Sequence, residues 1–267
     1  MSSLSVIISS YNNSPAMVKT LAGYSVQTNT NFDIIIADDG SSQAHLDAIE
    51  AAIAKFGLTA QVSTIADKGF RKCKALNDAV RLSTANALLF TDADIVPRKD
   101  LVAQHKRLLK PGFFIAGGSH IHTTEASLPL LTESSILSND CFTKRFWHNA
   151  GHSNRKIKQR FERGNVSAAL LNLLSWRSKA FIGCNASCWR ESFEQVNGFD
   201  ESIGYGAEDI DFGLRLTNAG VKSRRYTYSL IGLHQWHPRP YRNESQVQAN
   251  KAHIYARYRQ GVSWIDQ

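Results

Sequence analysis

The sequence predicts an α/β fold in which helices flank a central, mainly parallel β-sheet. Short apolar runs alternate with segments of helical periodicity over the first hundred residues, and this alternation is typical of βαβ units. Three of the apolar runs end in polar residues, around positions 9, 38 and 92. Because ligands bind beyond the carboxyl ends of the strands in such sheets, we expect these three ends to meet in one cleft.

The expected elements follow in order from the N-terminus. Residues 4–10 form an apolar, β-branched run that predicts the first strand. Ser14 and Pro15 predict a helix that reaches about residue 26, with Ser14 as its cap and Pro15 in the first turn. The same patterns predict further strands at 32–37, 61–65 and 87–91 and further helices at 46–56 and 74–82.

The composition is that of an ordinary globular protein. The chain has 267 residues, 43% hydrophobic and 20% charged, which is enough for one large domain or two small ones. No stretch approaches the ~18 apolar residues that span a bilayer, and the N-terminus lacks the pattern of a secretory signal, so we expect a cytoplasmic protein. The four cysteines are too few for a disulfide framework and are expected to be reduced thiols.

The net charge of +8 is concentrated in one segment. Residues 144–163 contain seven Lys or Arg residues and a single acid, Glu162, while the rest of the chain is nearly balanced. A generally basic surface would suit a nucleic-acid-binding protein, whereas this concentration predicts a local patch and no nucleic-acid partner. The patch would contact an anionic membrane surface or ligand, or else be only a solvated polar segment.

Asp92 and Asp94 directly follow the apolar run 87–91. They bring two hard oxygen ligands to the edge of the sheet, which suits a divalent cation that carries phosphates. A turn is the simpler interpretation of Asp-x-Asp, because Asp is common in turns. The metal interpretation therefore depends on the other residues that meet at this edge.

The other strand ends carry side chains that suit a nucleotide. Ser9 and Tyr11 end the first strand, Asp39 follows the second, and Arg71 lies beyond the third. Tyr11 can pack on a base, Asp39 can accept hydrogen bonds from a base or ribose, and Arg71 can reach a base or phosphate. Each of these three side chains could instead have a structural role: Tyr11 in the core, Asp39 at a helix cap and Arg71 on the surface. Neither Gly-x-Gly-x-x-Gly nor Gly-x-x-x-x-Gly-Lys is present after the first strand, so dinucleotide and P-loop sites lose their main support.

Glu208, Asp209 and Asp211 begin a predicted helix, directly after a glycine-containing turn at 204–206. Acids at a helix N-terminus are stabilised by the helix dipole and are often simple caps, although this explains one acid more readily than three. A carboxylate that stays ionised near a cation can also take a proton from a hydroxyl nucleophile. The cluster is therefore a candidate for general-base chemistry.

Four segments together resemble a known family. They are Ser-Val-Ile-Ile-Ser-Ser-Tyr-Asn at 5–12, Asp-Asp-Gly-Ser at 38–41, Asp-Ala-Asp at 92–94 and Gly-Tyr-Gly-Ala-Glu-Asp at 204–209. The combination is similar to the GT-A glycosyltransferases of family 2, and the C-terminal half resembles galactosyltransferase and chondroitin-polymerase-type domains. The resemblance covers residues 4–240 and is specific for fold and reaction type but not for the sugar.

The resemblance implies a GT-A fold with a site for a UDP-sugar donor. Asp39 would contact uracil, and Tyr11 and Arg71 would help to hold the nucleotide. Asp94 would ligate Mn²⁺ or Mg²⁺ on the diphosphate, while Asp92 would face the ribose or the sugar.

Family members often add a histidine ligand further along the chain. His234 is the favoured candidate because it ends the apolar run 228–233, which we expect to be a strand, and His237 follows closely. A lone histidine is more often a core or surface residue, but two histidines beside Trp236 after a strand favour a metal role.

The resemblance also implies the catalytic residues. Asp209 would be the base, Glu208 would bind an acceptor or donor hydroxyl, and Asp211 would do either or simply cap the helix. Trp189 and Trp236 would form stacking walls for sugar rings on the acceptor side, or else belong to the core.

The implied reaction is the inverting, metal-dependent transfer of a hexose or N-acetylhexosamine to a hydroxyl of a glycan or glycolipid acceptor. It would serve the synthesis of a bacterial surface polysaccharide such as lipopolysaccharide. A related retaining group has an amide at the second acidic position, so Asp209 indicates inversion. The alternatives are a nucleotidyltransferase, whose glycine- and lysine-rich loop is missing, and a non-catalytic nucleotide- or glycan-binding module.

Residues 1–267 are expected to form a single GT-A catalytic domain. A nucleotide-sugar-binding half at 1–120 and an acceptor and catalytic half at 177–240 would be separated by a basic helical insertion at 130–176. The insertion departs from the family pattern and would act as an acceptor-side lid or contact anionic lipid or a lipid-linked glycan at the inner face of the cell membrane. A C-terminal helical tail at 241–267 would close over the site or pack on the surface.

Overall fold

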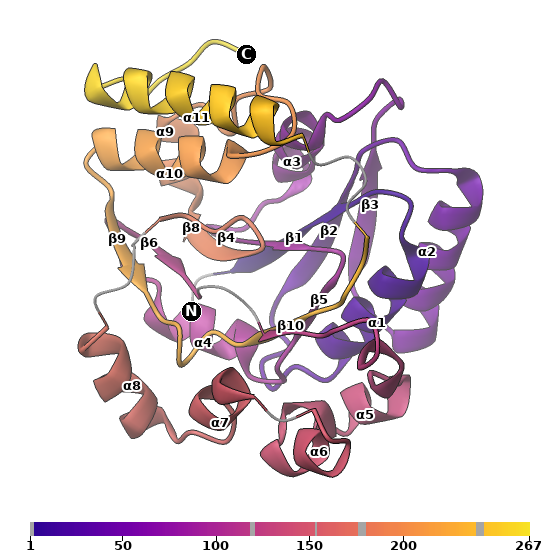
Figure 1. Cartoon of the computed structure of the whole chain (residues 1–267). Coiled ribbons are helices and arrows are strands. Elements are labelled where there is room, and N and C mark those ends of the chain that lie inside the picture. Colours follow the sequence, from indigo (N-terminus) through magenta and orange to yellow (C-terminus); the bar gives the residue numbers. More distant parts are fainter. Residues whose placement is uncertain (1–2, 118–120, 153, 176–179, 239–242) are drawn as a thin grey trace.

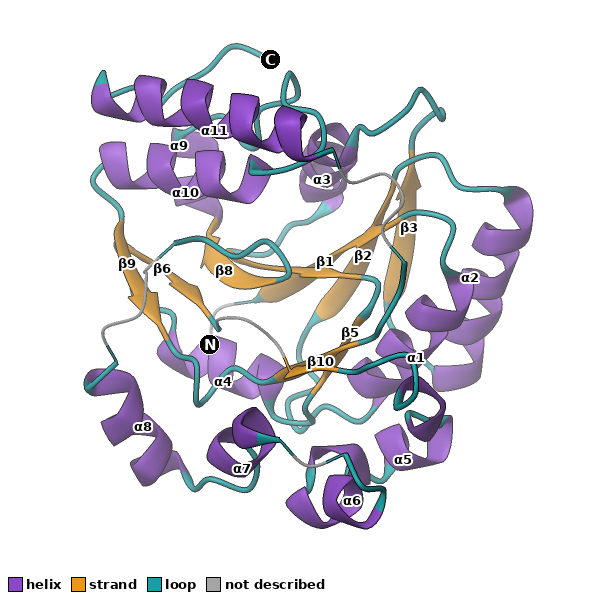
Figure 2. Ribbon diagram, viewed as in Figure 1, coloured by secondary structure: helices purple, strands orange, loops and turns teal. Residues whose placement is uncertain are grey.

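The computed structural model describes residues 3–117, 121–152, 154–175, 180–238 and 243–267. In this part of the chain a seven-stranded sheet lies between helices, and a three-stranded sheet lies beside it (Figure 1, Figure 2). The large sheet is mainly parallel, which confirms the α/β class predicted from the sequence.

The large sheet has the strand order β3-β2-β1-β4-β8-β6-β9. The first four are parallel to their neighbours: β3 (Ala60–Thr64), β2 (Asp33–Asp38), β1 (Leu4–Ser10) and β4 (Ala87–Asp92). β8 (Asn185–Trp189) is antiparallel to both β4 and β6 (Phe113–Ala116), and β9 (Lys222–Arg225) pairs in parallel with β6. All four strands predicted in the first hundred residues are present, with ends shifted by at most one residue.

The small sheet consists of β5 (Ile95–Pro97), β10 (Gly232–His234) and β7 (Ile121–His122). β10 is the middle strand, antiparallel to β5 and parallel to β7. The predicted strand at 228–233 is thus shorter and begins later, and His234 is its last residue. The small sheet helps to position the site, because its first strand begins at the residue after Asp94.

Helices cover both faces of the large sheet (Figure 1). One face carries α1 (Ser14–Ser25), α2 (Gln43–Phe56) and α4 (Leu101–Leu108), and the other carries α3 (Lys72–Leu82), α9 (Arg190–Gln195) and α10 (Glu208–Asn218). The N-cap of α1 is Asn13, so the prediction that Ser14 caps this helix is wrong. Ser14 is already helical, because Pro15 is accommodated within the first turn.

The two cores follow from the alternation of side chains along the strands. Val6 and Ile8 of β1 belong to the same apolar cluster as Met17 and Leu21 of α1, whereas Ile7 between them belongs to the cluster that contains Phe212 of α10. Successive side chains of a strand point to opposite faces of the sheet. A strand that is apolar at every position is therefore buried on both sides, as expected for parallel strands between helix layers.

The segment between β7 and β8 is helical. It contains α5 (Glu133–Leu137), α6 (Lys144–Asn149), α7 (Arg155–Arg160) and α8 (Asn165–Leu173), with 3-10 turns at Leu128–Leu130 and Asp140–Phe142. Trp147, Ile157 and Phe161 form a separate apolar cluster with Val96 and Leu233 of the small sheet. These helices thus pack against the small sheet and lie below it in Figure 1. The expected domain boundaries at 176–177 and 240–241 lie outside the described residues.

The last helix, α11 (Glu244–Arg259), packs along α10 (Figure 2). Arg257 donates hydrogen bonds of 2.7 Å to Asp200 and to Asp211, and Ile254 is buried against Ile203 and Ala207. The predicted helical tail therefore packs on the helix that carries the acidic cluster. None of the helices in the described residues has the length and hydropathy needed to cross a bilayer.

Candidate active site

The carboxyl ends of β1 and β4 lie side by side, as the sheet order requires. Ser9 pairs with Asp92 in the register of these strands, and its hydroxyl donates a hydrogen bond of 2.6 Å to Asp92 Oδ1. Asp39, just after β2, donates its backbone N–H to the carbonyl of Ser10. The three strand ends expected to converge therefore meet at one edge of the sheet.

Asp38 and Asp39 have different environments. Asp38 Oδ2 accepts hydrogen bonds from the backbone of Gly40 and Ser41 and from the Thr64 hydroxyl, so this carboxylate holds the turn together. Asp39 Oδ2 accepts one bond of 2.8 Å from the backbone N–H of Arg71. Its Oδ1 is buried without a hydrogen-bond partner among the described residues, and burial raises the pKa of this carboxyl. A buried acceptor without a partner is costly in a free protein, which makes Asp39 the better candidate for a ligand contact.

Tyr11 and Arg71 lie at the rim of this edge. The Tyr11 side chain is 52% exposed and its hydroxyl donates to Asp67 at 3.3 Å. Arg71 is the N-cap residue of α3 and is partly buried. Both have room to meet a nucleotide, and their contact with one stays a prediction.

Asp94 lies beside two histidines because β5 and β10 pair with Ile95 opposite His234. Asp94 Oδ2 is 3.3 Å from His234 Nε2 and 2.9 Å from His237 Nε2. One ligand atom from each of the three residues lies within 4.8 Å of the other two. The three residues proposed as metal ligands are thus brought together by segments about 140 positions apart in the chain.

This cluster fits a divalent cation. Asp94 Oδ1 is buried and has no hydrogen-bond partner in the part of the chain that the structure describes. One carboxylate and two imidazoles suit Mn²⁺ and related ions better than Mg²⁺, which prefers oxygen ligands and keeps several waters. A cation at this position would compensate the buried carboxylate.

Lys72 lies between Asp92 and Glu208, and no pattern in the sequence indicates this position. Its Nζ donates a hydrogen bond of 2.8 Å to Asp92 Oδ1 and lies 3.7 Å from Glu208 Oε1. Burial by itself lowers the pKa of the Lys72 ammonium, but the carboxylates of Asp92 and Glu208 raise it well above its ordinary value. In the sequence it was one of three basic residues at 71–74, just before the helix expected at 74–82; α3 in fact begins at Lys72.

Asp92 is the ionised partner of this pair. Burial would raise the pKa of its carboxyl, but the Lys72 ammonium, the hydrogen bonds from Lys72 and Ser9, and His234 together lower it. Its Oδ1 is the atom that receives both hydrogen bonds. Asp92 therefore stays charged at the carboxyl end of β4.

Asp209 has the properties of a base near neutral pH. It is the second residue of α10, and its carboxylate accepts hydrogen bonds from the backbone of Gly183 at 3.2 Å and of Ile210 at 2.8 Å. Burial and the neighbouring Glu208 carboxylate raise the pKa of Asp209 to about 6. A base whose pKa lies near the working pH can both take and release a proton.

Two residues predicted to bind the acceptor make structural contacts instead. Asp211 is 2% exposed, and its carboxylate binds Arg215 and Arg257, so it holds α10 to its neighbours. Trp189 pairs with Ala87 at the opposite end of β4, five residues and roughly 17 Å of strand from Asp92. The contacts of both residues are thus structural, because Asp211 is buried in an ion-pair network and Trp189 packs against the core; an acceptor contact of either residue stays a prediction.

Trp236 is the remaining aromatic candidate for the acceptor side. It is 36% exposed and lies in the chain next to His237, while its backbone N–H donates to the hydroxyl of Thr123 at 2.8 Å. Its position beside the metal-ligand candidates is compatible with a sugar contact, which stays a prediction.

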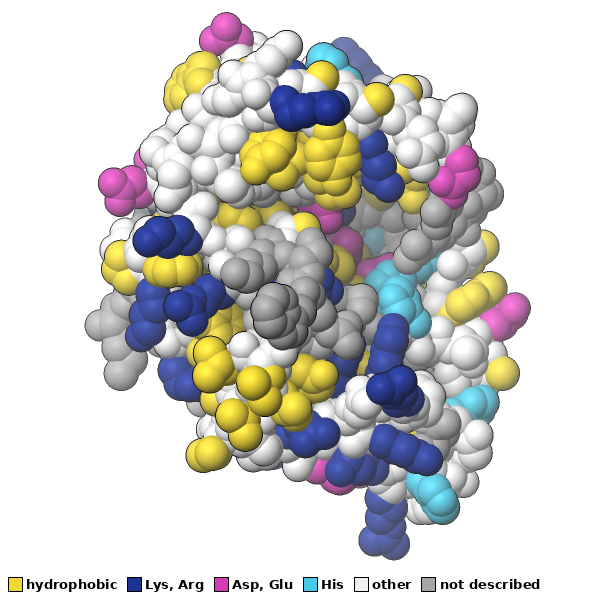
Figure 3. Space-filling model, turned by 60° about the vertical axis from the view of Figure 1, so that its left-hand side comes forward, with side chains coloured by type: hydrophobic (Ala, Val, Ile, Leu, Met, Phe, Trp, Pro, Cys, Tyr) yellow, Lys and Arg dark blue, Asp and Glu magenta, His cyan; other side chains and the backbone are white. Residues whose placement is uncertain are grey.

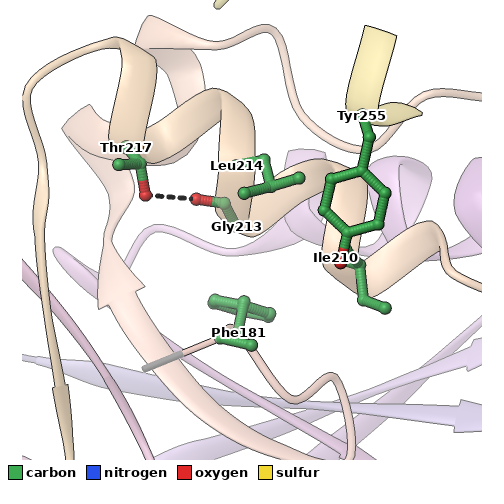
Figure 4. Close-up of a pocket in the computed structure, with 7 residues that line it drawn as sticks. Phe181, Ile210, Gly213, Leu214, Thr217 and Tyr255 are labelled. Atoms are coloured by element: carbon green, nitrogen blue, oxygen red, sulfur yellow. Dashed lines mark hydrogen bonds between the residues drawn. The ribbon is translucent and has the colours of Figure 1, made fainter. Parts of the chain in front are cut away.

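A cavity of about 320 Å³ lies behind α10 and outside this cluster. Figure 4 shows Phe181 facing Gly213 and Leu214 of α10, with the ring of Tyr255 from α11 at the side. Ile210 and Thr217 complete the labelled lining, which is mainly apolar. The acids and histidines described above do not line it, so we do not assign the chemistry to this cavity.

Comparisons with protein families agree over most of the chain. A family model described as "Glycosyl transferase family 2" matches residues 5–196. A second, described as "N-terminal domain of galactosyltransferase", matches residues 168–235. The second match contains the acidic cluster and His234.

Curated relatives and a solved structure are similar over most of this chain. The glycosyltransferase YfnE of Bacillus subtilis is 27% identical over 95% of the chain and 70% of its own length. Chondroitin synthase of Escherichia coli is 25% identical over 91% of the chain, which spans only 36% of that protein. A mannosyltransferase from Pyrobaculum calidifontis, solved in complex with GDP-Man and Mn²⁺, has a TM-score of 0.59 at 20% identity over 89% of this chain and 58% of its own.

Proposed function

The chain belongs to glycosyl transferase family 2 and has the GT-A fold, and from this premise we propose that it is an inverting, metal-dependent transferase. It would move a hexose or N-acetylhexosamine from a UDP-sugar to a hydroxyl of a glycan or glycolipid acceptor. The observation that carries this proposal is Asp209, a carboxylate whose pKa is raised to about 6 and whose neighbour Glu208 lies 3.7 Å from the lysine that binds Asp92.

The donor proposal depends on Asp39. Its Oδ1 is buried and has no hydrogen-bond partner among the residues described, so it can accept a hydrogen bond from the N3–H of uracil. Tyr11, exposed at the rim, would lie on the base, and Arg71 would reach the phosphates. GDP-mannose, the donor bound in the Pyrobaculum structure, is the natural competitor to UDP in a donor screen.

The metal proposal assigns Asp94, His234 and His237 as the ligands of Mn²⁺ or a related ion. A divalent ion bound there would neutralise negative charge on the departing nucleoside diphosphate. Lys72 and Arg71 are the cations that the chain itself offers to the same phosphates.

The proposed chemistry uses Asp209 as the base. Its ionised carboxylate would take the proton of the acceptor hydroxyl while the hydroxyl oxygen attacks the anomeric carbon from the face opposite the diphosphate. One bond forms as the other breaks, so a single displacement inverts the anomeric centre. Glu208, next to Asp209 and 3.7 Å from Lys72, would hold a hydroxyl of one of the two sugars.

We infer the biological setting from the relatives. The chondroitin synthases make polysaccharide, as their name states, so an acceptor in bacterial surface polysaccharide or lipopolysaccharide synthesis is the proposed class. The four cysteines are free thiols, which fits a reducing compartment such as the cytoplasm.

The experiment is a measurement of UDP release with Mn²⁺ and candidate acceptors. Wild-type protein should turn over, Asp209→Asn should lose at least roughly a hundredfold in kcat, and both should bind UDP alike. Asp47→Asn, the same change at an exposed carboxylate of α2, is the matched control. Equal turnover by wild type and Asp209→Asn would show that Asp209 is not the base.

The two alternatives predict other outcomes. A nucleotidyltransferase would release pyrophosphate from a nucleoside triphosphate instead of UDP from a UDP-sugar. A non-catalytic binding module would bind the UDP-sugar without turnover with any acceptor, and Asp209→Asn would leave this binding unchanged.

A further inference from the structure

Helix α8 exposes an apolar face to solvent. Val166, Leu170, Leu173 and Leu174 are 86%, 58%, 77% and 63% exposed. Their spacing of four, three and one residues puts them on one side of the helix. Single exposed apolar side chains are common, but a contiguous group of four marks an interaction surface.

The opposite face of α8 holds the helix in place with small and polar residues. Ala168 and Asn172 are the buried residues of this helix. Asn172 donates a hydrogen bond of 2.9 Å to the hydroxyl of Ser229 and accepts one of 2.9 Å from the backbone N–H of Tyr228. The helix is therefore oriented by a buried polar side chain, and the orientation turns its leucines away from the core.

Exposed basic side chains lie on the two helices that precede α8. Helix α7, four residues before α8 in the chain, exposes Arg155 and Lys158, and Arg145 is exposed on α6. Figure 3 shows hydrophobic side chains gathered low on this side of the molecule, with Lys and Arg side chains on both sides of them. Not every charge of 144–163 contributes, because Arg160 is buried and Lys144 pairs with Glu162 at 3.7 Å.

We propose that the apolar face of α8 and the basic residues of α6 and α7 form a docking surface for an anionic lipid bilayer. Apolar side chains flanked by Lys and Arg are the composition of helices that lie in a membrane interface. The leucines would enter the boundary between headgroups and acyl chains, and the cations would pair with lipid phosphates.

The chemistry of the surface favours a bilayer over other occupants. Val166 and Leu173 protrude from the surface, and a bilayer accepts protruding apolar side chains without a matching cavity. Two copies of this chain docked symmetrically through this surface would bring their basic residues together, and like charges repel. An anionic layer removes this repulsion.

This surface goes beyond the proposed sugar transfer and does not depend on it. The docking surface also suggests where the acceptor comes from. Leu174 and Gly183 are nine positions apart in the chain, which limits their separation to roughly 30 Å. Gly183 is the residue that donates to the Asp209 carboxylate. A docked molecule would thus have Asp209 within reach of an acceptor carried by a membrane lipid.

The test is co-sedimentation of the full chain with vesicles. Wild type should bind vesicles that contain phosphatidylglycerol, bind pure phosphatidylcholine weakly, and lose binding as salt screens the charges. The triple change Leu170→Ser, Leu173→Ser and Leu174→Ser should lower the partition coefficient by roughly tenfold or more. Arg155→Glu with Lys158→Glu should lower it on anionic vesicles only.

Leu82→Ser, at an exposed leucine of α3 on the other side of the large sheet, is the control and should bind like wild type. Circular dichroism and UDP binding check that each variant is folded, and turnover with a water-soluble acceptor should be unchanged. The proposal is overturned if wild type does not bind anionic vesicles, or if the triple variant binds them as well as wild type does. A wild-type dimer that the triple variant dissociates would overturn it in favour of a second copy.

Discussion

The Lys72 ammonium lies between the Asp92 carboxylate at the end of β4 and the acidic start of α10. Lys72→Met would leave Asp92 and Glu208 without the cation between them, so we expect kcat to fall roughly tenfold to a hundredfold. Because Lys72 also lowers the pKa of Asp209, the acid limb of the pH profile should move to higher pH in the variant. Steady-state kinetics across pH measures both effects.

Two further variants make the Lys72 experiment specific. Lys72→Arg keeps the charge and should recover part of the rate and the position of the acid limb. Lys74→Met removes a neighbouring lysine of α3 that pairs with Asp78 and should behave like wild type. A Lys72→Met enzyme with an unshifted pH profile would contradict the role of Lys72 in holding Asp209 ionised.

The raised pKa of Asp209 predicts opposite pH dependences for activity and stability. The base is ionised above pH 6, so kcat/KM should rise as the pH passes through about 6 and level off above it. The folded protein holds this proton more tightly than the unfolded chain, so stability is lost as the pH rises towards 6. Asp209→Asn should therefore stabilise the protein at pH 8, by at most roughly 3 kcal/mol, and much less at pH 4.

Thermal unfolding of wild type and Asp209→Asn at the two pH values measures this difference. Asp47→Asn again serves as control and should show no pH-dependent gain, since Asp47 is exposed. An acid limb near pH 4 would mean that the titrating base is another carboxylate.

Residues of the candidate site could be predicted where a local sequence pattern indicated them. Asp92 and Asp94 lie at the end of a recognisable strand, and Asp209 lies in the first turn of a helix after glycines. Lys72 could not be predicted, because its two acidic partners lie 20 and 136 positions further along the chain. Trp189 was assigned to the acceptor side because a lone aromatic residue does not indicate which end of a strand it occupies.

Helix α10 packs closely against the segment before β8. A methyl group at Gly213 would lie 2.6 Å from Phe181 Cβ and 3.0 Å from the Phe181 backbone nitrogen. Ala is the better helix former by about 1 kcal/mol, but this contact forces α10 away from Phe181, so Gly213→Ala should destabilise the protein by about 1–3 kcal/mol. Urea unfolding measures the change.

The control for this substitution is Gly204→Ala, where an added methyl group meets nothing within 4 Å. It should leave stability within about 0.5 kcal/mol of wild type, as expected for a surface substitution. A Gly213→Ala protein as stable as the control would show that α10 can move away from Phe181 without loss.

Long helices and strands with a clear periodicity could be predicted from the sequence, whereas very short ones could not. β1 and β4 are continuous apolar runs and were found to within one residue. β5 and β7 have three and two residues, too few for any period to show. They are strands only because β10, more than a hundred positions later, pairs with both.

For the whole molecule, metal and nucleotide binding should be linked. If the ion held by Asp94, His234 and His237 also contacts the diphosphate, UDP should raise the melting temperature more with Mn²⁺ than without it. His237→Ala should remove this synergy, while His253→Ala, at an exposed histidine of α11, should keep it. A thermal shift by UDP that is the same with Mn²⁺ or with a chelator would separate the nucleotide site from the metal cluster.

The position of β8 has a consequence for how the chain reaches its fold. β8 lies between β4 and β6, although β6 precedes it by about seventy positions and the helices α5 to α8 intervene. β6 and β9 therefore have no strand of the growing sheet to join until that long connection has closed, and closing it costs chain entropy. We expect pulse-labelled hydrogen exchange to show β1 to β4 protected early and β6 and β9 late. Since β8 begins two residues after Gly183, the refolding enzyme should regain the sheet edge proposed to bind the nucleotide before it regains turnover.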